Sequence, residues 1–418
     1  MKTNYQSITL LLISIITAGL AQGLTIIAIP WHFTDQLNLS SRFSLLYAII
    51  TFIGLFWGLY AGVIIDSVNR KKILLYSNWT GCLIFFSIGL IGFLLNNLNQ
   101  FLFFFAFATC SFYYIIFFPN LYALAQELTN KKEYVKINSL IEIFFQTTSI
   151  ISATICGLLL SNNQMILDFF NVSVIGFEKW EIWEIFLLNG LLYASTSILL
   201  RYVKYDDHRI KPSTSILSAF QKIKTGMFFL AKNKDILIYG VCSQIIFAFL
   251  IVELFALLPL FVKNCLNENI ITFSLADVIY AAGAIIAGLI TIKILKYIDK
   301  ILLTFILIIT TGYAFFIMIK LHRLDVFFLT TLIIGLTNAS TRITRMSYLF
   351  ETTPNYLMGR INTIFNSINT IIRCVLILVF SLPWFAYSKH VVIGYKIGIY
   401  ILILFAIPLI FQIKKRLN

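Results

Sequence analysis

Charged residues are scarce in this chain of 418 residues: they make up 12% of it, whereas hydrophobic residues make up 59%. Soluble domains carry roughly 25% charged residues, so a water-soluble fold is excluded. Apolar runs of about 20 residues recur along the chain, each long enough to cross the hydrocarbon layer of a bilayer as a helix. Short segments of alternating polarity, which a membrane β-barrel requires, are not evident. The sequence therefore predicts an all-α polytopic membrane protein.

Cysteine and histidine are also few, at six and four residues. The cysteines show no metal-ligand spacing and the histidines are scattered. The active site of a polytopic enzyme would require a clustered Asp/His/Ser or Lys/Glu constellation at one predicted membrane face, and the sequence shows none. We therefore expect no catalytic residue, no metal site and no cofactor.

Twelve apolar runs are long enough to span the membrane. They lie near residues 8–31, 44–65, 73–94, 101–123, 138–160, 182–200, 236–261, 270–294, 301–319, 326–347, 361–384 and 391–412. The first run is followed directly by another span and lacks a small-residue cleavage site, so it is predicted to be a retained helix rather than a signal peptide.

Acidic residues (18) are fewer than basic residues (32), and the basic residues are unevenly placed. The N-terminal segment, the even-to-odd connections and the C-terminal tail hold 24 of the 32, the opposite connections hold seven, and Arg373 lies inside a span. Lys and Arg accumulate in cytoplasmic loops. We therefore expect a multi-pass protein of the bacterial inner membrane with both termini in the cytoplasm. This bias and anionic lipid partners explain the net charge of +14 without a nucleic-acid partner.

The longest basic connection, residues 201–235, divides the chain into an N-terminal half of six spans (1–200) and a C-terminal half of six spans (236–418). Within this connection, apolar residues repeat at helical spacing over residues 216–230. That pattern predicts an amphipathic helix in the headgroup plane, which tethers two halves that move relative to each other.

The two halves look like a diverged repeat. When Ile73 is placed opposite Ile301, both are followed by Leu-Leu and the ends of spans 2 and 8 align. The second copy reads Lys-Tyr-Ile-Asp-Lys at the turn and lacks the glycine and aspartate of the first copy. The predicted architecture is two pseudo-symmetric six-helix halves around a central cavity.

The turn between spans 2 and 3 is charged and contains glycine, unlike its apolar surroundings. Residues 62–72 read GVIIDSVNRKK. The turn resembles the loop signature of the major facilitator superfamily, G-x-x-x-D-R-x-G-R-[RK], at Gly62, Asp66, Arg70 and Lys71. Serine and asparagine stand where the signature has its first arginine and second glycine. The resemblance implies a transporter that works by alternating access.

Four further segments resemble the subfamily of bacterial drug and siderophore exporters, which includes enterobactin exporters and macrolide efflux proteins. They are residues 27–31 in span 1, 136–140 at the start of span 5, 220–235 after the central connection and 354–361 before span 11. The chain departs from the subfamily at Gln22, where aspartate is common, and at the antiporter pattern G-P-x-x-G-G, of which Gly157 remains.

The resemblance points to a conformational gate at the turn after span 2. The candidate gate residues are Gly62, Asp66, Arg70, Lys71, Gly359 and Arg360. Asp66 is placed to face the positive N-terminal end of span 11, and Gly62 would let two backbones approach closely. Such a contact forms in one conformation and breaks in the other. The alternative, a role in membrane orientation alone, accounts for the basic residues but not for Gly62 and Asp66.

Arg373 lies near the centre of span 11, where a charge costs about 2.5–3.5 kcal/mol on insertion scales. It must therefore face a cavity or a partner. One interpretation is a counter-ion for an anionic cargo or for a coupling carboxylate. The other is a permanent structural pair with Glu142 or Glu253.

Two acidic and two amide side chains complete the candidate list. Glu253 lies inside span 7, where desolvation favours the neutral form of a carboxylate, so it is a candidate proton carrier. Glu142 lies at the cytoplasmic end of span 5, and an interfacial position is its alternative. Gln22 and Gln244 are candidate contacts for cargo or coupling ion, with helix packing as the alternative.

Together these features predict a secondary active transporter that exports a small organic molecule by proton-driven antiport. The subfamily resemblance favours a siderophore or drug-like cargo. Similar sequences also serve as lysophospholipid flippases, which is the alternative within transport. A non-transporting membrane receptor or scaffold is a further alternative, although it would not need Arg373 and Glu253 in the hydrocarbon. The expected partners are the cargo, an anion if Arg373 binds it, together with protons and membrane lipids, and the protein is expected to act as a monomer.

Overall fold

The computed structural model describes residues 5–130, 133–161, 179–205, 216–386 and 390–417. Within these ranges the chain is helical and has no strand. Twelve of the described helical stretches are long and apolar enough to cross a membrane. The predictions of an all-α polytopic fold and of twelve spans are therefore confirmed.

The first six spans and the helix that follows them are continuous helices. They are α1 (Tyr5–Asp35), α2 (Ser40–Ser67), α3 (Arg70–Leu95), α4 (Gln100–Leu128), α5 (Tyr134–Leu160), α7 (Ile182–Tyr202) and α8 (Ile216–Lys232). The α8 helix falls in the connection between the two sets of spans. Its Leu230 is buried, whereas Met227 and Phe228 are exposed.

The seventh span is assembled from several shorter helical pieces, and the remaining spans are single helices. These elements are α9 (Lys234–Cys242), α10 (Ile245–Val252), the π-helical turn η2 (Glu253–Leu257), α11 (Leu258–Asn264), α12 (Ile270–Ile294), α13 (Lys300–Leu321), α14 (Leu324–Thr352), α15 (Asn355–Phe380), α16 (Pro383–Ala386) and α17 (Val391–Leu417). The eleventh span ends at Phe380 rather than at the predicted residue 384.

Two interruptions in the seventh span have local causes. Between α9 and α10, the hydroxyl of Ser243 donates to the carbonyl of Gly240 at 3.1 Å, a local bond that competes with the helical pattern. Further along, Pro259 has no N–H to donate to the preceding turn. The N–H of Leu258 donates instead to the carbonyl of Glu253, five residues back, which forms the π-helical turn.

The turns of the two halves repeat the same backbone chemistry. In the described ranges, four non-glycine residues have positive φ: Asn38, Asn96, Asn267 and His322. The first and third precede α2 and α12, and the second and fourth end α3 and α13. The helices α3 and α13 also begin alike, since side chains of Asn69 and Asp299 cap their first turns. Sharp helix ends need such residues, so their recurrence at corresponding turns supports the two pseudo-symmetric halves.

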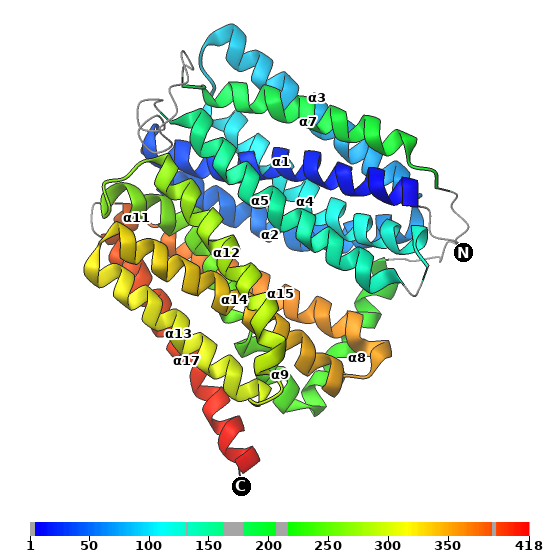
Figure 1. Ribbon diagram of the computed structural model, residues 1–418, viewed down its shortest axis with the longest axis vertical. Helices are drawn as coiled ribbons and strands as arrows, with labels where there is room; N and C mark the ends of the chain where they lie inside the picture. The colour runs from blue at the N-terminus through cyan, green and yellow to red at the C-terminus, as the bar shows by residue number, and fades with distance from the viewer. Residues whose placement is uncertain (1–4, 131–132, 162–178, 206–215, 387–389, 418) are drawn as a thin grey trace. The chain divides into compact units, whose positions relative to one another are not determined.

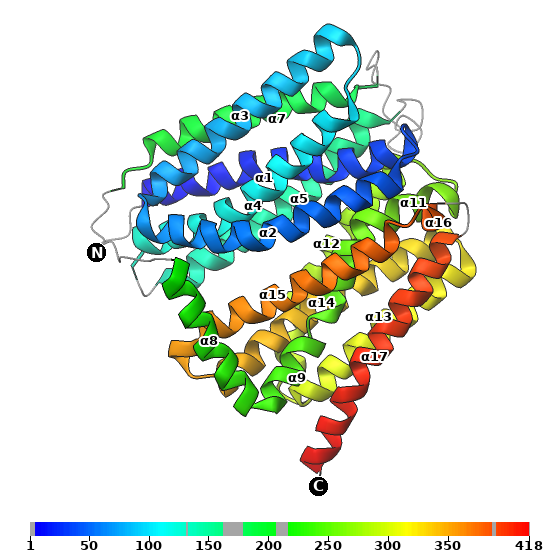
Figure 2. The ribbon, with the colours of Figure 1, turned by 180° about the vertical axis from the view of Figure 1, so that it is seen from behind.

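Contacts divide the chain into two compact units. Unit 1 holds Met1–Gln36, Ile53–Ile216 and Asn269–Val278, and unit 2 holds Leu37–Phe52, Leu217–Glu268 and Ile279–Asn418. In unit 1, α3 runs along α7, and α1 lies beside α5 and α7 (Figure 1). In unit 2, α13 lies beside α14 and α17 (Figure 2). In the same unit, α10 packs on α15.

Glycines bring α12 and α14 close together in unit 2. A Cβ added to Gly283 would lie 2.1 Å from the carbonyl oxygen of Leu332, and one added to Gly335 would lie 2.1 Å from that of Tyr280. Neither position can accept a side chain without moving a backbone. Small residues allow this kind of approach between membrane helices, and here it positions α14, the helix that carries two of the arginines discussed below.

Candidate functional site

A charged cluster joins the start of α3 to the end of α4 in unit 1. Nη1 of Arg70 lies 3.0 Å from Oε1 of Glu127 and donates to the carbonyl of Ala123 at 2.5 Å. The amide of Asn120 donates to the carbonyl of Arg70 at 2.8 Å, and the hydroxyl of Tyr205 donates to Glu127. The two charged side chains are only 15% and 25% exposed. Removing one would leave the other partly buried and unpaired, which costs more than losing an exposed ion pair.

Lys71 holds the end of α7. Its Nζ donates to the carbonyl oxygens of Arg201 at 2.8 Å and Val203 at 2.7 Å. The last carbonyls of a helix lack intrahelical donors, and the helix dipole favours a cation beside them. Arg70 and Lys71 thus link α3 to α4 and α7.

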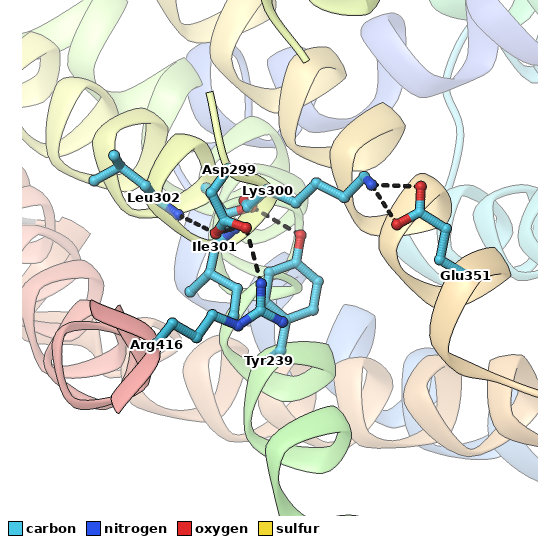
Figure 3. Close-up of polar contacts among 8 residues, drawn as sticks. Tyr239, Asp299, Lys300, Ile301, Leu302, Glu351 and Arg416 are labelled. Atoms are coloured by element: carbon cyan, nitrogen blue, oxygen red, sulfur yellow. Dashed lines mark hydrogen bonds and ion pairs between the residues drawn. The ribbon is translucent and has the colours of Figure 1, made fainter. Parts of the chain in front are cut away.

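A counterpart cluster lies at the start of α13 in unit 2 (Figure 3). The carboxylate of Asp299 accepts hydrogen bonds from two backbone N–H groups of the first turn, at 2.9 and 3.4 Å. Nη1 of Arg416, near the end of α17, lies 2.8 Å from the same carboxylate. Beside it, Nζ of Lys300 contacts Glu351 at the end of α14, at 2.5 Å. The second copy of the charged turn therefore forms a network of its own, although it lacks the glycine and aspartate of the first.

The two clusters correspond residue by residue. In each, the basic first residue of a helix, Arg70 or Lys300, pairs with a glutamate near the end of a span, Glu127 or Glu351. Neither glutamate is among the site residues predicted from the sequence. The sequence did contain a signal for them. Each glutamate stands two residues before the threonine that caps the C-terminal end of its helix.

Arg360, a candidate gate residue in α15, contacts α8 within unit 2. Its Nη1 donates to Oγ1 of Thr225 at 2.8 Å. The helices approach closely here, since a Cβ added to Gly226 would lie 3.3 Å from Cβ of Arg360. The helix between the two sets of spans is therefore joined to the start of the eleventh span by a hydrogen bond and by packing.

Three other candidate gate residues have no described contact that bears on gating. The side chain of Asp66 and the surroundings of Gly359 lie outside the described part of the chain. A Cβ added to Gly62 would meet no described atom within 4 Å. The close backbone approach expected at Gly62 is therefore not seen in this structure.

Arg373 is partly buried in α15. Its Nη2 donates to Oγ1 of Thr370 on its own helix at 3.2 Å, and its Nε is buried without a hydrogen-bond partner. Tyr47 of α2 lies close enough to interact with its charge. Among the described residues no carboxylate lies within 4.0 Å of Arg373, so a pair with Glu253 is not formed. The side chain of Glu142 lies outside the described residues.

Glu253 is buried, at 7% exposure, at the start of the π-helical turn. The hydroxyl of Tyr395 in α17 donates to its Oε1 at 2.7 Å. The ring of Tyr395 contacts Phe261 and Phe315, with centroids 5.2 and 5.5 Å away. No basic nitrogen of the described residues lies within 4.0 Å of Glu253. The carboxyl group therefore has one neutral donor in aromatic surroundings, at a kind of turn that is frequent at functional sites.

The two candidate glutamines are both buried, at 4% for Gln22 and 2% for Gln244. The backbone oxygen of Gln22 lies 4.0 Å from Sγ of Cys110. Gln244 lies at the break between α9 and α10, and its backbone oxygen accepts a hydrogen bond from Nδ2 of Asn369 at 3.2 Å. The structure places Gln22 in unit 1 and Gln244 in unit 2.

Arg345 is a buried ionisable residue that the sequence analysis missed. The prediction of membrane orientation counts Arg342 and Arg345 among the basic residues of the connection after span 10. Both lie inside α14, which continues to Thr352. The helix extends five residues beyond the predicted end of this span. Arg345 is only 8% exposed, so it belongs to the interior of unit 2 rather than to a solvated loop.

Comparisons with solved structures find transporters with the same fold. A D-xylose–proton symporter matches with a TM-score of 0.70 and 13% identity, over 96% of this chain and 97% of the other. The nucleoside transporter NupG matches with a TM-score of 0.68 and 13% identity, over 98% and 99%. A bacterial homologue of the human lysosomal transporter Spinster, inward-facing and occupied, matches with a TM-score of 0.68 and 10% identity, over 97% and 96%. At these identities the likeness establishes the fold alone.

The family comparison covers most of the chain. No match is found among curated proteins. A family model described as Major Facilitator Superfamily matches residues 11–377, a range that includes the charged turn after α2, both ionic clusters except for Arg416, and the eleventh span, with Arg373, as far as Ile377. Together with the twelve spans and the repeated turn chemistry, this match shows that the chain belongs to the major facilitator superfamily of membrane transporters.

Proposed function

We propose that this transporter exports a small organic molecule, siderophore- or drug-like, in exchange for protons. Membership of the superfamily establishes membrane transport, and the four segments that resemble drug and siderophore exporters support export. The observation that carries the proposal is the separation of two buried ionisable groups in unit 2. Arg373 has no described acidic partner within 4.0 Å, and Tyr395 is the single described hydrogen-bond partner of the Glu253 side chain. Arg373 is thereby available to bind a cargo, and Glu253 is available to carry a proton.

The same proposal places the protein in a bacterial inner membrane with both termini in the cytoplasm. It rests on the uneven distribution of Lys and Arg among the connections, which sets orientation in membranes. A reporter that is active only in the periplasm, fused after Asn418, is expected to be silent. This fusion is the orientation control for the transport experiment that follows.

Export is tested in inside-out vesicles from cells that make the protein. A labelled catecholate siderophore and a fluorescent lipophilic dye are supplied outside, and the proton gradient is generated by respiration. We expect one of the two probes to accumulate, and a protonophore to abolish the accumulation. Vesicles that contain the Arg373→Ala variant at equal abundance serve as the control. Accumulation that persists after the gradient collapses would rule out proton-driven export.

A lipid probe distinguishes the alternative within transport. Labelled lysophosphatidylethanolamine is added to one leaflet of proteoliposomes, and its appearance in the other leaflet is measured by chemical quenching. We expect no movement above that of protein-free liposomes. Rapid movement of the lysolipid without accumulation of either soluble probe would replace the export proposal with that of a lysophospholipid flippase.

The proposed gate is the segment Gly62–Lys71 together with Gly359 and Arg360. Arg70 and Lys71 support the gate by fixing the start of α3 to the ends of α4 and α7. Asp66, four residues before Arg70, supplies the charge that makes and breaks contacts during the cycle. The gate residues therefore act on the rate of conformational exchange rather than on cargo affinity.

We expect Asp66→Asn to slow transport at least about tenfold, because the loss of one charge-assisted hydrogen bond changes a conformational equilibrium by about that factor or more. Cargo binding to the detergent-purified variant should be unchanged. Lys72→Gln is the matched control, since Lys72 is exposed in the same turn, and it should transport at the wild-type rate. Weakened binding with an unchanged rate for bound cargo would contradict the gating role of Asp66.

A further inference from the structure

Unit 2 contains six acidic residues. Five of the six are paired as follows: Asp235 with Lys415, Asp299 with Arg416, Asp325 with Arg323, Glu351 with Lys300, and Glu253 with Tyr395. The sixth, Glu268, lies in the connection between α11 and α12. None of these described carboxylates is within 4.0 Å of Arg345 or Arg373. Unit 2 therefore carries positive charge inside its spans that no described carboxylate neutralises.

Arg345 is the more deeply buried of these two arginines. It lies seven residues before the end of α14, about 10 Å along the helix axis, and its side chain is 8% exposed. Nη1 donates to the carbonyl oxygen of Ser243 at 3.1 Å, and Nε is buried with no hydrogen-bond partner. An arginine keeps its charge in proteins, and a buried charge without a counter-ion is strongly destabilising. An anion would satisfy both the charge and the unpaired N–H.

The break in the seventh span supplies further polar groups next to Arg345. Arg345 binds the carbonyl of Ser243, and Asn369 of α15 binds the next carbonyl, that of Gln244, at 3.2 Å. The two accepting carbonyls belong to consecutive residues of the break, so the side chains of Arg345 and Asn369 that donate to them lie close together. Nδ2 of Asn369 also lies 3.5 Å from Oε1 of Gln244, which brings two buried amide side chains to the same place. Interrupted membrane helices of this kind form substrate sites in transporters.

We propose that Arg345, with the amides of Asn369 and Gln244, binds the carboxylate of an organic anion at the break between α9 and α10. A guanidinium offers parallel N–H donors that match the two oxygens of a carboxylate. The amides of Asn369 and Gln244 orient the bound carboxylate without adding charge to the site. Arg373 follows Asn369 by four residues on α15 and so lies on the same face one turn away, where its charge adds to the preference for anions. The assignment rests on the proposed transport function, in that the bound anion is the cargo.

Binding is tested without transport, on the full chain purified in an uncharged detergent at low salt. Sodium benzoate is the probe, and benzamide, which has a similar shape and no charge, is its neutral control. The midpoint of thermal unfolding is measured against the concentration of each, with sodium chloride added to hold ionic strength constant. A ligand that binds only the folded protein raises this midpoint. We expect benzoate to raise it and benzamide to leave it unchanged.

Substitutions locate the benzoate site. Arg345→Gln should weaken the benzoate response at least about tenfold, since it removes a charge-assisted hydrogen bond, whereas Arg345→Lys should retain part of the response as a point charge. Arg323→Gln is the matched control, because it removes an exposed positive charge from the beginning of the same helix. A wild-type response from Arg345→Gln would overturn the assignment, as would a failure of benzoate to stabilise the wild-type protein.

A second variant keeps the test decisive if Arg345→Gln does not fold. Asn369→Asp is nearly isosteric and places a carboxylate beside Arg345. We expect it to raise the unfolding midpoint of the ligand-free protein and to abolish the benzoate response, because the site then contains its own anion. An unchanged benzoate response would overturn the site. Failure of the wild-type protein to bind benzoate, together with probe accumulation in energised vesicles, would reject the anion site alone. Benzoate binding by the wild-type protein without any accumulation would reject the export proposal alone.

Discussion

Replacing Arg373 with alanine is expected to lower transport at least about tenfold without loss of folded protein, because the substitution removes a charge-assisted contact and leaves no described carboxylate within 4.0 Å without its partner. Among the described residues the guanidinium donates to Thr370 of its own helix alone, and its Nε has no hydrogen-bond partner there. Arg373→Lys should retain part of the activity, since the point charge remains while the planar fork is lost. The measurement is probe accumulation in energised inside-out vesicles, normalised to the amount of folded protein.

The double variants Arg373→Gln/Glu253→Gln and Arg373→Gln/Glu142→Gln separate a cargo contact from a structural pair. If Arg373 serves the cargo, neither double variant should recover transport. Recovery of folding and of most activity in either one would show that the single substitution had mainly left an unpaired buried charge. Wild-type transport by well-expressed Arg373→Ala would end the proposed role of Arg373.

Replacing Glu253 with glutamine is expected to abolish accumulation driven by the proton gradient while leaving downhill movement of the cargo. The amide keeps the size of the carboxyl group and can still accept the hydrogen bond from Tyr395, but it cannot release a proton. Without a proton carrier, transport is no longer coupled to the gradient, so accumulation should fall to that of wild-type vesicles treated with a protonophore. Downhill flux is measured in the same vesicles after the probe has been preloaded.

Tyr395→Phe is the companion variant. It removes the single described donor to Glu253 and retains the ring that packs against Phe261 and Phe315. We expect gradient-driven accumulation to persist in this variant, at an altered rate. Gradient-driven accumulation by Glu253→Gln at the wild-type level would contradict the role of Glu253 in coupling. Equal loss of thermal stability in both variants without a change in coupling would assign the pair to folding alone.

The spans could be predicted because each is a local property of the chain. A helix must satisfy its own backbone hydrogen bonds in the hydrocarbon, so a run of about 20 apolar residues is enough to predict a span. The errors arise where local composition is ambiguous. The tenth span continues past its predicted end to Thr352, and Arg342 and Arg345 both lie inside its helix, although charged residues usually mark the end of a span.

The charged turn could be recognised, but its partners could not. Arg70 was identified from its spacing to Gly62 and Asp66, whereas its ion-pair partner Glu127 lies on another helix. The same holds for Lys300 and Glu351. Contacts between residues so far apart depend on which helices are neighbours and on their rotation, and a single sequence does not contain that information.

The sequence by itself determined the membrane class, the twelve spans, the twofold repeat and the resemblance to a transporter family. These follow from composition, hydrophobic length and short motifs, all of which act over a few turns of helix. Only the tertiary structure decided that Glu253 binds Tyr395 rather than Arg373, and that Arg345 is buried against the break in the seventh span. Those outcomes depend on helix packing, since the cost of a buried charge is set by the groups that surround it in space.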